Sequence, residues 1–176
     1  METQNKHLLL AAKILEELGA RGLEVILGGG MALVVMGSRR VTMDFDFLLT
    51  VQEEKLDHIV TVFYQHGFEL VSKLNENGDV LRTIDNKNIA KIRLKLDKPD
   101  SAFFFNHKSE LKIDLLFDFP FPAQEVAKNS LPFKIGKHTI HIASVDDLIR
   151  MKEIAYADRK VSTDAQDLEF LRKLKK

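Results

Sequence analysis

Residues 44–47 read Asp-Phe-Asp-Phe and begin a run of large apolar residues. Side chains two apart on a β-strand point to the same face. The spacing therefore predicts a strand over residues 44–51, with both aspartates on one face and both phenylalanines toward the core. Two carboxylates on one face repel each other, and a divalent cation bound between Asp44 and Asp46 would remove that repulsion. The alternative is a half-exposed edge strand whose acids are solvated.

A third acid, Asp114, lies in the otherwise apolar residues 111–117, which we expect to form another strand. An acid among apolar residues is unfavourable unless its charge has a partner. If the two strands are neighbours, Asp114 completes a three-carboxylate site, which suits Mg²⁺ and two-metal phosphoryl chemistry. The alternative is a salt bridge from Asp114 to a lysine or arginine, such as Lys91 or Arg93 on a neighbouring strand.

Three glycines, residues 28–30, separate a short buried strand at 25–27 from a short apolar helix at 31–36. Glycine lets the backbone approach a ligand closely, and the first amides of a helix face an anion. The spacing matches neither the Walker pattern nor the dinucleotide-binding glycine pattern. The stretch is interpreted as a phosphate cradle, and its alternative is a tight turn.

The remaining pattern predicts an α+β fold, in which helices flank a mixed β-sheet. Helices are expected from the start of the chain to Leu18, at 53–66, from Ser144, and from Ser162 or Thr163. Further strands are expected at 68–71, 80–84, 89–96, 132–135 and 139–142, with a turn at 85–88. We expect a core over residues 1–143 and a C-terminal helical segment packed on it over 144–176. Residues 103–105, three phenylalanines, form either core or the lining of an acceptor pocket.

Composition excludes several classes of protein. The 26 basic and 26 acidic residues balance, so binding of nucleic acid through an overall positive charge is not indicated. The chain has no cysteine, and its histidines show no zinc-ligand spacing near the acids. No apolar run reaches the roughly 20 residues of a membrane span, so we expect a soluble, cytoplasmic protein without a membrane partner.

Residues 29–46 carry a Gly-Gly turn, a short helix and the sequence Arg-Arg-Val-Thr-Met-Asp-Phe-Asp. This stretch resembles the signature of the nucleotidyltransferase superfamily, which has the DNA-polymerase-beta-like fold. The match is nearest to small prokaryotic branches, the abortive-infection toxins and minimal nucleotidyltransferases, with some aminoglycoside or lincosamide nucleotidyltransferases. Residues 142–152 and 159–171 are similar to the family's later helical signatures.

The resemblance implies a role for each acid. Asp44 and Asp46 would hold the Mg²⁺ or Mn²⁺ ions that bind a nucleoside triphosphate. Asp114 would help to hold the catalytic metal and could accept the proton of the acceptor hydroxyl.

The resemblance also implies a phosphate-binding group. Gly29 and Gly30 would present backbone N–H groups to the phosphates, Arg40 could reach a phosphate, and Lys152 could neutralise the triphosphate. The alternatives are that Arg40 pairs with a surface acid and that Lys152 is a solvated helix lysine. A structural ion network that fixes the last helix is the expected role of three further residues: Arg159, Asp164 and Asp167.

The implied activity is transfer of a nucleoside monophosphate from a nucleoside triphosphate to an acceptor hydroxyl. The alternatives are a non-catalytic or partner-dependent protein of a toxin–antitoxin or defence pair, and a protein whose acids form only a structural cation site. The acceptor stays open between a small antibiotic, a transfer RNA end and a protein side chain. The partner stays open between a second copy of the chain and an antitoxin-type protein.

Overall fold

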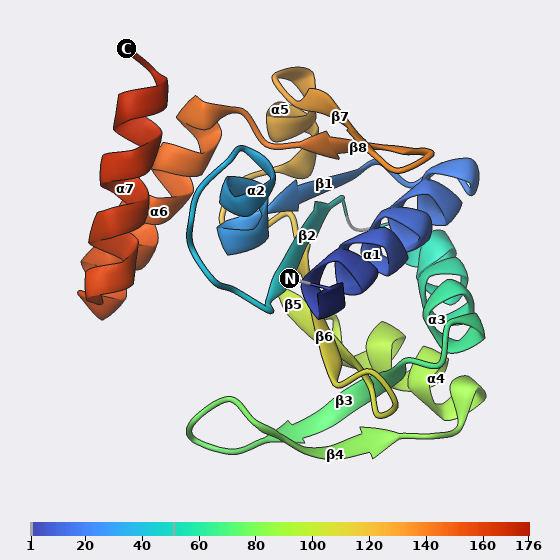
Figure 1. Ribbon diagram of the computed structural model, residues 1–176. Helices are drawn as coiled ribbons and strands as arrows, with labels where there is room; N and C mark the ends of the chain where they lie inside the picture. Colours follow the sequence, from blue (N-terminus) through green and yellow to red (C-terminus); the bar gives the residue numbers. More distant parts are fainter. Residues whose placement is uncertain (1, 51) are drawn as a thin grey trace.

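The computed structural model describes residues 2–50 and 52–176, where seven α-helices surround an eight-stranded mixed sheet of order β4-β3-β5-β6-β2-β1-β8-β7 (Figure 1). This confirms the predicted α+β fold and its C-terminal helical pair. The strands are β1 (Val25–Gly28), β2 (Phe45–Leu49), β3 (Glu69–Leu74), β4 (Val80–Ile84), β5 (Ser101–Asn106), β6 (Leu111–Phe117), β7 (Leu131–Ile135) and β8 (His138–Ile142). The helices are α1 (Glu2–Ala20), α2 (Gly29–Val35), α3 (Leu56–Gln65), α4 (Lys87–Asp97), α5 (Ala123–Lys128), α6 (Val145–Arg159) and α7 (Ser162–Leu174), with a 3-10 turn at Glu53–Lys55.

The acidic strand β2 lies at the centre of the sheet, antiparallel to β1 and parallel to β6. Phe45 and Phe47 are fully buried, whereas Asp46 between them is only partly buried. The predicted alternation of core and polar faces holds over these three residues, whereas Leu48, on the same face as Asp46, is buried. The strand ends at Leu49, and the last residue of the predicted strand, Val51, lies outside the described residues.

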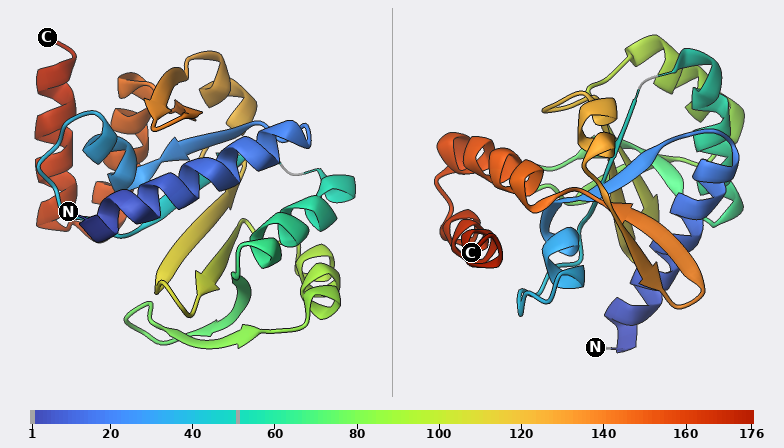
Figure 2. Two further views of the ribbon diagram at one scale, coloured as in Figure 1. Left: turned by 45° about the vertical axis from the view of Figure 1, so that its right-hand side comes forward. Right: turned by 90° about the horizontal axis from the view of Figure 1, so that it is seen from above.

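Helices α1 and α3 lie side by side over one face of the sheet, while α6 and α7 pair next to α2 (Figures 1 and 2). The core beneath α3 is aromatic. The Phe63 ring stacks on Phe104 of β5 with a centroid separation of 4.2 Å, and meets Phe68 edge-on at 5.6 Å. The central phenylalanine of residues 103–105 is thus core. None of the helices described is long and apolar enough to cross a membrane.

The strand predicted at residues 89–96 is wrong, because this segment lies within helix α4. Its apolar residues alternate with polar ones, and this two-residue period is typical of a β-strand. The buried side chains, however, are Ala90 and Leu94, four residues apart as on one face of a helix, and Ile92 is exposed. The Asn86 side chain accepts hydrogen bonds from the first N–H groups of the helix, so the segment predicted as a turn is a helix start.

Several other local predictions are confirmed. The predicted short helix is present as α2, although it begins at Gly29 rather than after the glycines, and β7 and β8 form the predicted hairpin. The Ser144 side chain caps α6 by accepting a hydrogen bond from the Asp147 N–H at 3.1 Å. Strand β5 had no sequence prediction, and it inserts between β3 and β6. It orders the three phenylalanines so that Phe104 faces the core and Phe103 lies beside Asp114 on the other face.

Candidate active site

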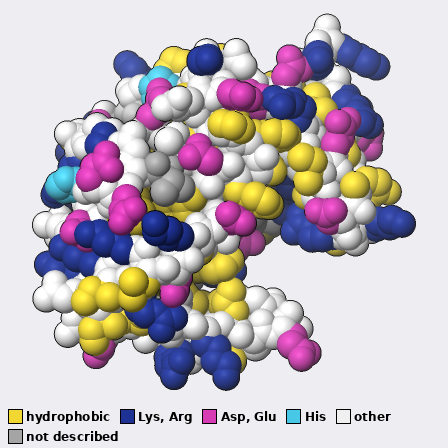
Figure 3. Space-filling model, turned by 180° about the vertical axis from the view of Figure 1, so that it is seen from behind, with side chains coloured by type: hydrophobic (Ala, Val, Ile, Leu, Met, Phe, Trp, Pro, Cys, Tyr) yellow, Lys and Arg dark blue, Asp and Glu magenta, His cyan; other side chains and the backbone are white. Residues whose placement is uncertain are grey.

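A cavity of about 450 Å³ lies against the polar face of β2 and β6. From behind, the molecule is hollowed between the side that carries α6 and α7 and the end that carries β3 and β4 (Figure 3), and the elements that line the cavity border this hollow. The lining includes every residue to which the sequence assigned a role in chemistry or phosphate binding: Gly29, Gly30, Arg40, Asp44, Asp46, Asp114 and Lys152. The cavity is within the size range of small-molecule sites.

Asp46 and Asp114 are direct register partners on the parallel strands β2 and β6. Partners at one register position point to the same side of a sheet, so both carboxyl groups face the cavity. Asp114 Oδ1 is buried and has no hydrogen-bond partner. The salt bridge considered for Asp114 is absent: Lys91 and Arg93 lie on α4, and Arg93 pairs with Asp97 at 3.1 Å.

The two carboxyl groups are electrostatically strained in the protein alone. Burial, and then the charge of Asp46, raises the pKa of Asp114 to about 8. Burial, and then the charge of Asp44, raises the pKa of Asp46, while Lys152, Arg40 and Lys112 act in the opposite direction. Both groups would therefore gain from a nearby positive charge.

Asp44 is separated from this pair. It precedes β2, its side chain is 68% exposed, and its Oδ1 lies 4.0 Å from Lys112 Nζ. Within residues 2–50 and 52–176, no three His, Cys, Asp or Glu side chains are placed to hold one metal ion. The structure thus brings two of the three predicted acids together and leaves the third at the cavity edge.

The glycine turn is in close contact with the acidic strand. Gly29 has a φ of +60°, and a Cβ built on it would lie 1.6 Å from Asp46 Oδ2. A side chain at this position would be strained and would displace the carboxyl group. A Cβ on Gly30 would lie 2.9 Å from Arg40 Cζ, so the guanidinium packs directly on the turn.

Arg40 and Lys152 are held by an ion network rather than exposed. Arg40 donates from Nη1 to Asp167 Oδ2. Lys152 is 7% exposed, and its Nζ lies 2.8 Å from Asp167 Oδ2 and 3.2 Å from Asp164 Oδ1. The alternative of a solvated Lys152 is therefore wrong, and the acid that pairs with Arg40 is buried rather than on the surface.

The last helix contributes the acids of this network. Asp164 and Asp167 of α7 are 2% and 3% exposed, and Arg159 Nη2 lies 3.1 Å from Asp164 Oδ2. The structural network expected from the sequence is present. Sequence reasoning missed that it extends to Arg40 and Lys152, because only the fold brings α7 to the loop before β2.

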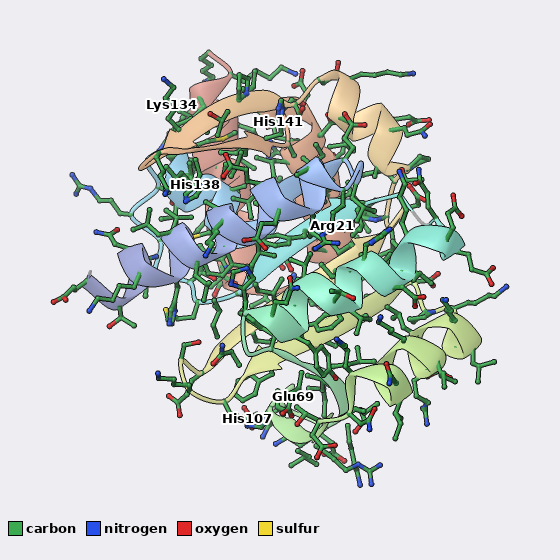
Figure 4. The ribbon with its side chains drawn as sticks, turned by 90° about the vertical axis from the view of Figure 1, so that its right-hand side faces the viewer. Arg21, Glu69, His107, Lys134, His138 and His141 are labelled. Carbon is green, nitrogen blue, oxygen red and sulfur yellow. The ribbon has the colours of Figure 1, made fainter. Side chains whose placement is uncertain are left out.

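Two histidines that form ion pairs with glutamates lie away from the aspartates of the cavity (Figure 4). His138 of β8 lies beside α1, with Nδ1 2.6 Å from Glu16 Oε2. His107 lies at the other end of the sheet, with Nε2 3.3 Å from Glu69 Oε2. Neither residue lines the cavity.

A family model described as "Nucleotidyl transferase AbiEii toxin, Type IV TA system" matches residues 13–175. No curated protein matches the chain.

Solved structures share the fold at low sequence identity. An antigenic nucleotidyltransferase-like protein from Paracoccidioides brasiliensis aligns with a TM-score of 0.61 and 15% identity, over 99% of this chain and 77% of that one. The lincomycin-bound lincosamide antibiotic adenylyltransferase LnuA aligns with a TM-score of 0.57 and 12% identity, over 95% of each chain. A putative nucleotidyltransferase from Thermotoga maritima aligns with a TM-score of 0.57 and 13% identity, over 93% of each chain. At such identities the likeness concerns the fold.

Proposed function

Because the chain belongs to the AbiEii nucleotidyl transferase toxin family, we propose that it transfers a nucleoside monophosphate from a nucleoside triphosphate to an acceptor hydroxyl. The observation that carries the proposal is the pairing of Asp46 and Asp114 on one face of the sheet. The glycine turn and the cationic side chains of Arg40 and Lys152 line the same cavity. Acids and cations placed together suit a substrate that brings both a metal ion and phosphates.

The residues present fit a divalent cation. Asp114 Oδ1 is a buried oxygen without a hydrogen-bond partner, and burial, followed by the charge of Asp46, raises the pKa of Asp114. Asp46 and Asp114 would hold Mg²⁺ or Mn²⁺, and Asp44, whose exposed side chain lies at the cavity edge, would join them. When bound, such ions lower the pKa of an attacking hydroxyl and stabilise the charge of the leaving pyrophosphate.

The side of the cavity that faces α2 and α6 suits the triphosphate. Gly29 and Gly30 leave the backbone open to a close approach by phosphate oxygens. Arg40 and Lys152 stand beside the turn with their charges fixed by Asp167. Fixed cations stabilise developing negative charge without having to reorganise during the reaction.

The opposite side of the cavity is where we place the acceptor. Phe103 of β5 is the register partner of Asp114, and Lys112 Nζ lies 5.4 Å from the centre of its ring. An acceptor hydroxyl that enters beside Phe103 reaches Asp114, whose Oδ1 would take the proton.

The test is transfer by the whole chain with Mg²⁺ or Mn²⁺ and γ-labelled nucleoside triphosphates, whose label leaves in the released pyrophosphate. Asp46→Asn should abolish release while the circular dichroism spectrum is retained. Asp79→Asn, on the exposed β3–β4 turn, is the matched control and should keep full activity. If no nucleoside triphosphate binds the wild-type protein with either metal, the proposal is wrong.

The family's description favours a biological setting for this activity, since it names a toxin of a type IV toxin–antitoxin system. We infer that transfer by this chain slows growth of its host and that an antitoxin-type partner counters the effect. Induced expression of the wild-type chain should reduce growth, whereas the Asp46→Asn chain should not. Equal growth inhibition by both chains would argue for the partner-dependent, non-catalytic alternative.

A further inference from the structure

Part of the cavity lining is apolar and includes none of the residues to which we assign metal or phosphate binding. Its side chains come from the end of β6, the loop after it and one face of α6: Leu116, Phe119, Pro120, Leu148, Met151, Ile154 and Ala155. Phe119 is 50% exposed and Ile154 is 40% exposed, so the wall presents apolar surface to solvent. Exposed apolar surface that lines a cavity marks a ligand-binding region.

The loop that carries Phe119 is fixed at both ends. The Asp118 N–H donates to the Leu49 carbonyl at 3.0 Å, and Asp118 Oδ1 accepts from the Ala123 N–H at 2.8 Å. The Arg150 guanidinium lies 4.1 Å from the centre of the Phe121 ring, which ties the loop to α6. Phe119 is therefore held at the cavity rather than placed on a free loop.

The apolar wall continues from the phosphate side along a single helix. A Cβ on Gly28 would lie 3.9 Å from Met151 Sδ, so Met151 stands next to the glycine turn, and Lys152 follows it. Ala155 comes about 6 Å further along α6, at roughly 1.5 Å per residue. A ligand with a charged end at the turn and a flat apolar end about one helical turn away matches this arrangement.

We propose that the nucleobase of the substrate packs between the Phe119 ring and the Ile154–Ala155 surface of α6, with the triphosphate directed to Gly29, Gly30 and Lys152. The inference rests on the proposed function and adds the subsite for the base. Stacking on an aromatic ring tolerates every base, because each base has a π-face.

The experiment compares two ligands that differ only in whether they carry a nucleoside. Calorimetric titration with Mg²⁺ measures the binding of the four nucleoside triphosphates and of inorganic tripolyphosphate to the whole chain. Phe119→Ala should weaken the best-binding nucleotide about tenfold or more, and should leave tripolyphosphate binding unchanged. Phe119→Trp, which keeps an aromatic face, should bind the nucleotide within a few-fold of wild type.

Phe133→Ala is the matched control, because Phe133 is a 37% exposed phenylalanine on the edge strand β7, outside the cavity. It should change neither affinity. The inference is overturned if Phe119→Ala weakens both ligands equally or neither. With either of those outcomes the wild-type protein still binds nucleotide, so the proposed function is not contradicted. If the wild-type protein binds neither ligand, both proposals fail.

Discussion

Asp46 and Asp114 stand opposite each other at one register position of two adjacent parallel strands, β2 and β6. The chain thereby places two acids on one face, where burial raises the pKa of each. For the protein alone this pairing is unfavourable, and for a protein that binds a cation it is useful. Active sites often retain such unfavourable arrangements because function needs them.

Metal-free protein should lose stability as the pH rises. Burial raises the pKa of Asp114 from 3.8 to about 8. Between these values the unfolded chain has released the proton that the folded chain keeps, so the free energy of unfolding falls as the pH increases. Asp114→Asn removes the contribution of Asp114 to this dependence, while that of Asp46 remains, and should stabilise the protein at pH 8 by on the order of 1–3 kcal/mol. Thermal unfolding in EDTA between pH 5 and 8.5 measures the effect.

The exposed Asp85 supplies the control for this experiment. Asp85→Asn should follow the wild-type stability curve throughout. A wild-type protein that gains stability over Asp114→Asn as the pH rises would contradict the assigned direction of the pKa shift.

Gly29→Ala should damage both stability and nucleotide binding. The new Cβ would lie 1.6 Å from Asp46 Oδ2, at a residue whose φ is +60°. The comparison is Gly78→Ala, at φ +84° with no atom within 4 Å of the new Cβ. The conformational strain, roughly 1–2 kcal/mol, is common to both variants. A clearly lower melting temperature for Gly29→Ala alone would isolate the contact with Asp46, and equal losses would exclude it.

Asp167→Ala should be among the most destabilising changes near the cavity. It would leave Arg40 and the buried Lys152 without their shared acid, and removing one partner of a buried ion pair costs about 3–5 kcal/mol. Glu153→Ala breaks an exposed pair with Arg172 and should cost less than about 1 kcal/mol. Chemical denaturation measures both, and similar values for the two would refute the role given to Asp167.

Two substitutions on α4 distinguish the helix from the strand that its pattern suggested. Leu94 is 2% exposed and Ile92 is 58% exposed. Leu94→Asp should destabilise the protein by more than about 3 kcal/mol, because it buries a charge. Ile92→Asp should cost less than about 1 kcal/mol. On a strand the two residues would share one face, so equal losses would favour the strand.

The sequence alone could predict what depends on short-range spacing. The glycines at the start of α2 and the Ser144 cap follow from local backbone chemistry and are present. Of the two acids predicted on one strand face, only Asp46 lies on β2, and Asp44 precedes the strand. That Asp46 and Asp114 meet was predicted only on the condition that their strands are neighbours, and the pairing of β2 with β6 fulfils that condition.

What the sequence could not predict depends on which elements are neighbours. Alternation in residues 89–96 fits a strand, and only packing against the rest of the fold selects Ala90 and Leu94 as the buried pair. The contact of Arg40 with Asp167 spans 127 residues of chain. No local pattern encodes this contact, which exists because α7 pairs with α6 beside α2.

The alternation of β2 has a consequence for how this site can change. The same five residues bury Phe45 and Phe47 and hold Asp46 at the cavity. A slip of one residue in the pairing of β2 with its neighbours would turn both rings to water and the acid inward. A chain with the shifted register would therefore not fold stably, so every stably folded chain has Asp46 at the cavity.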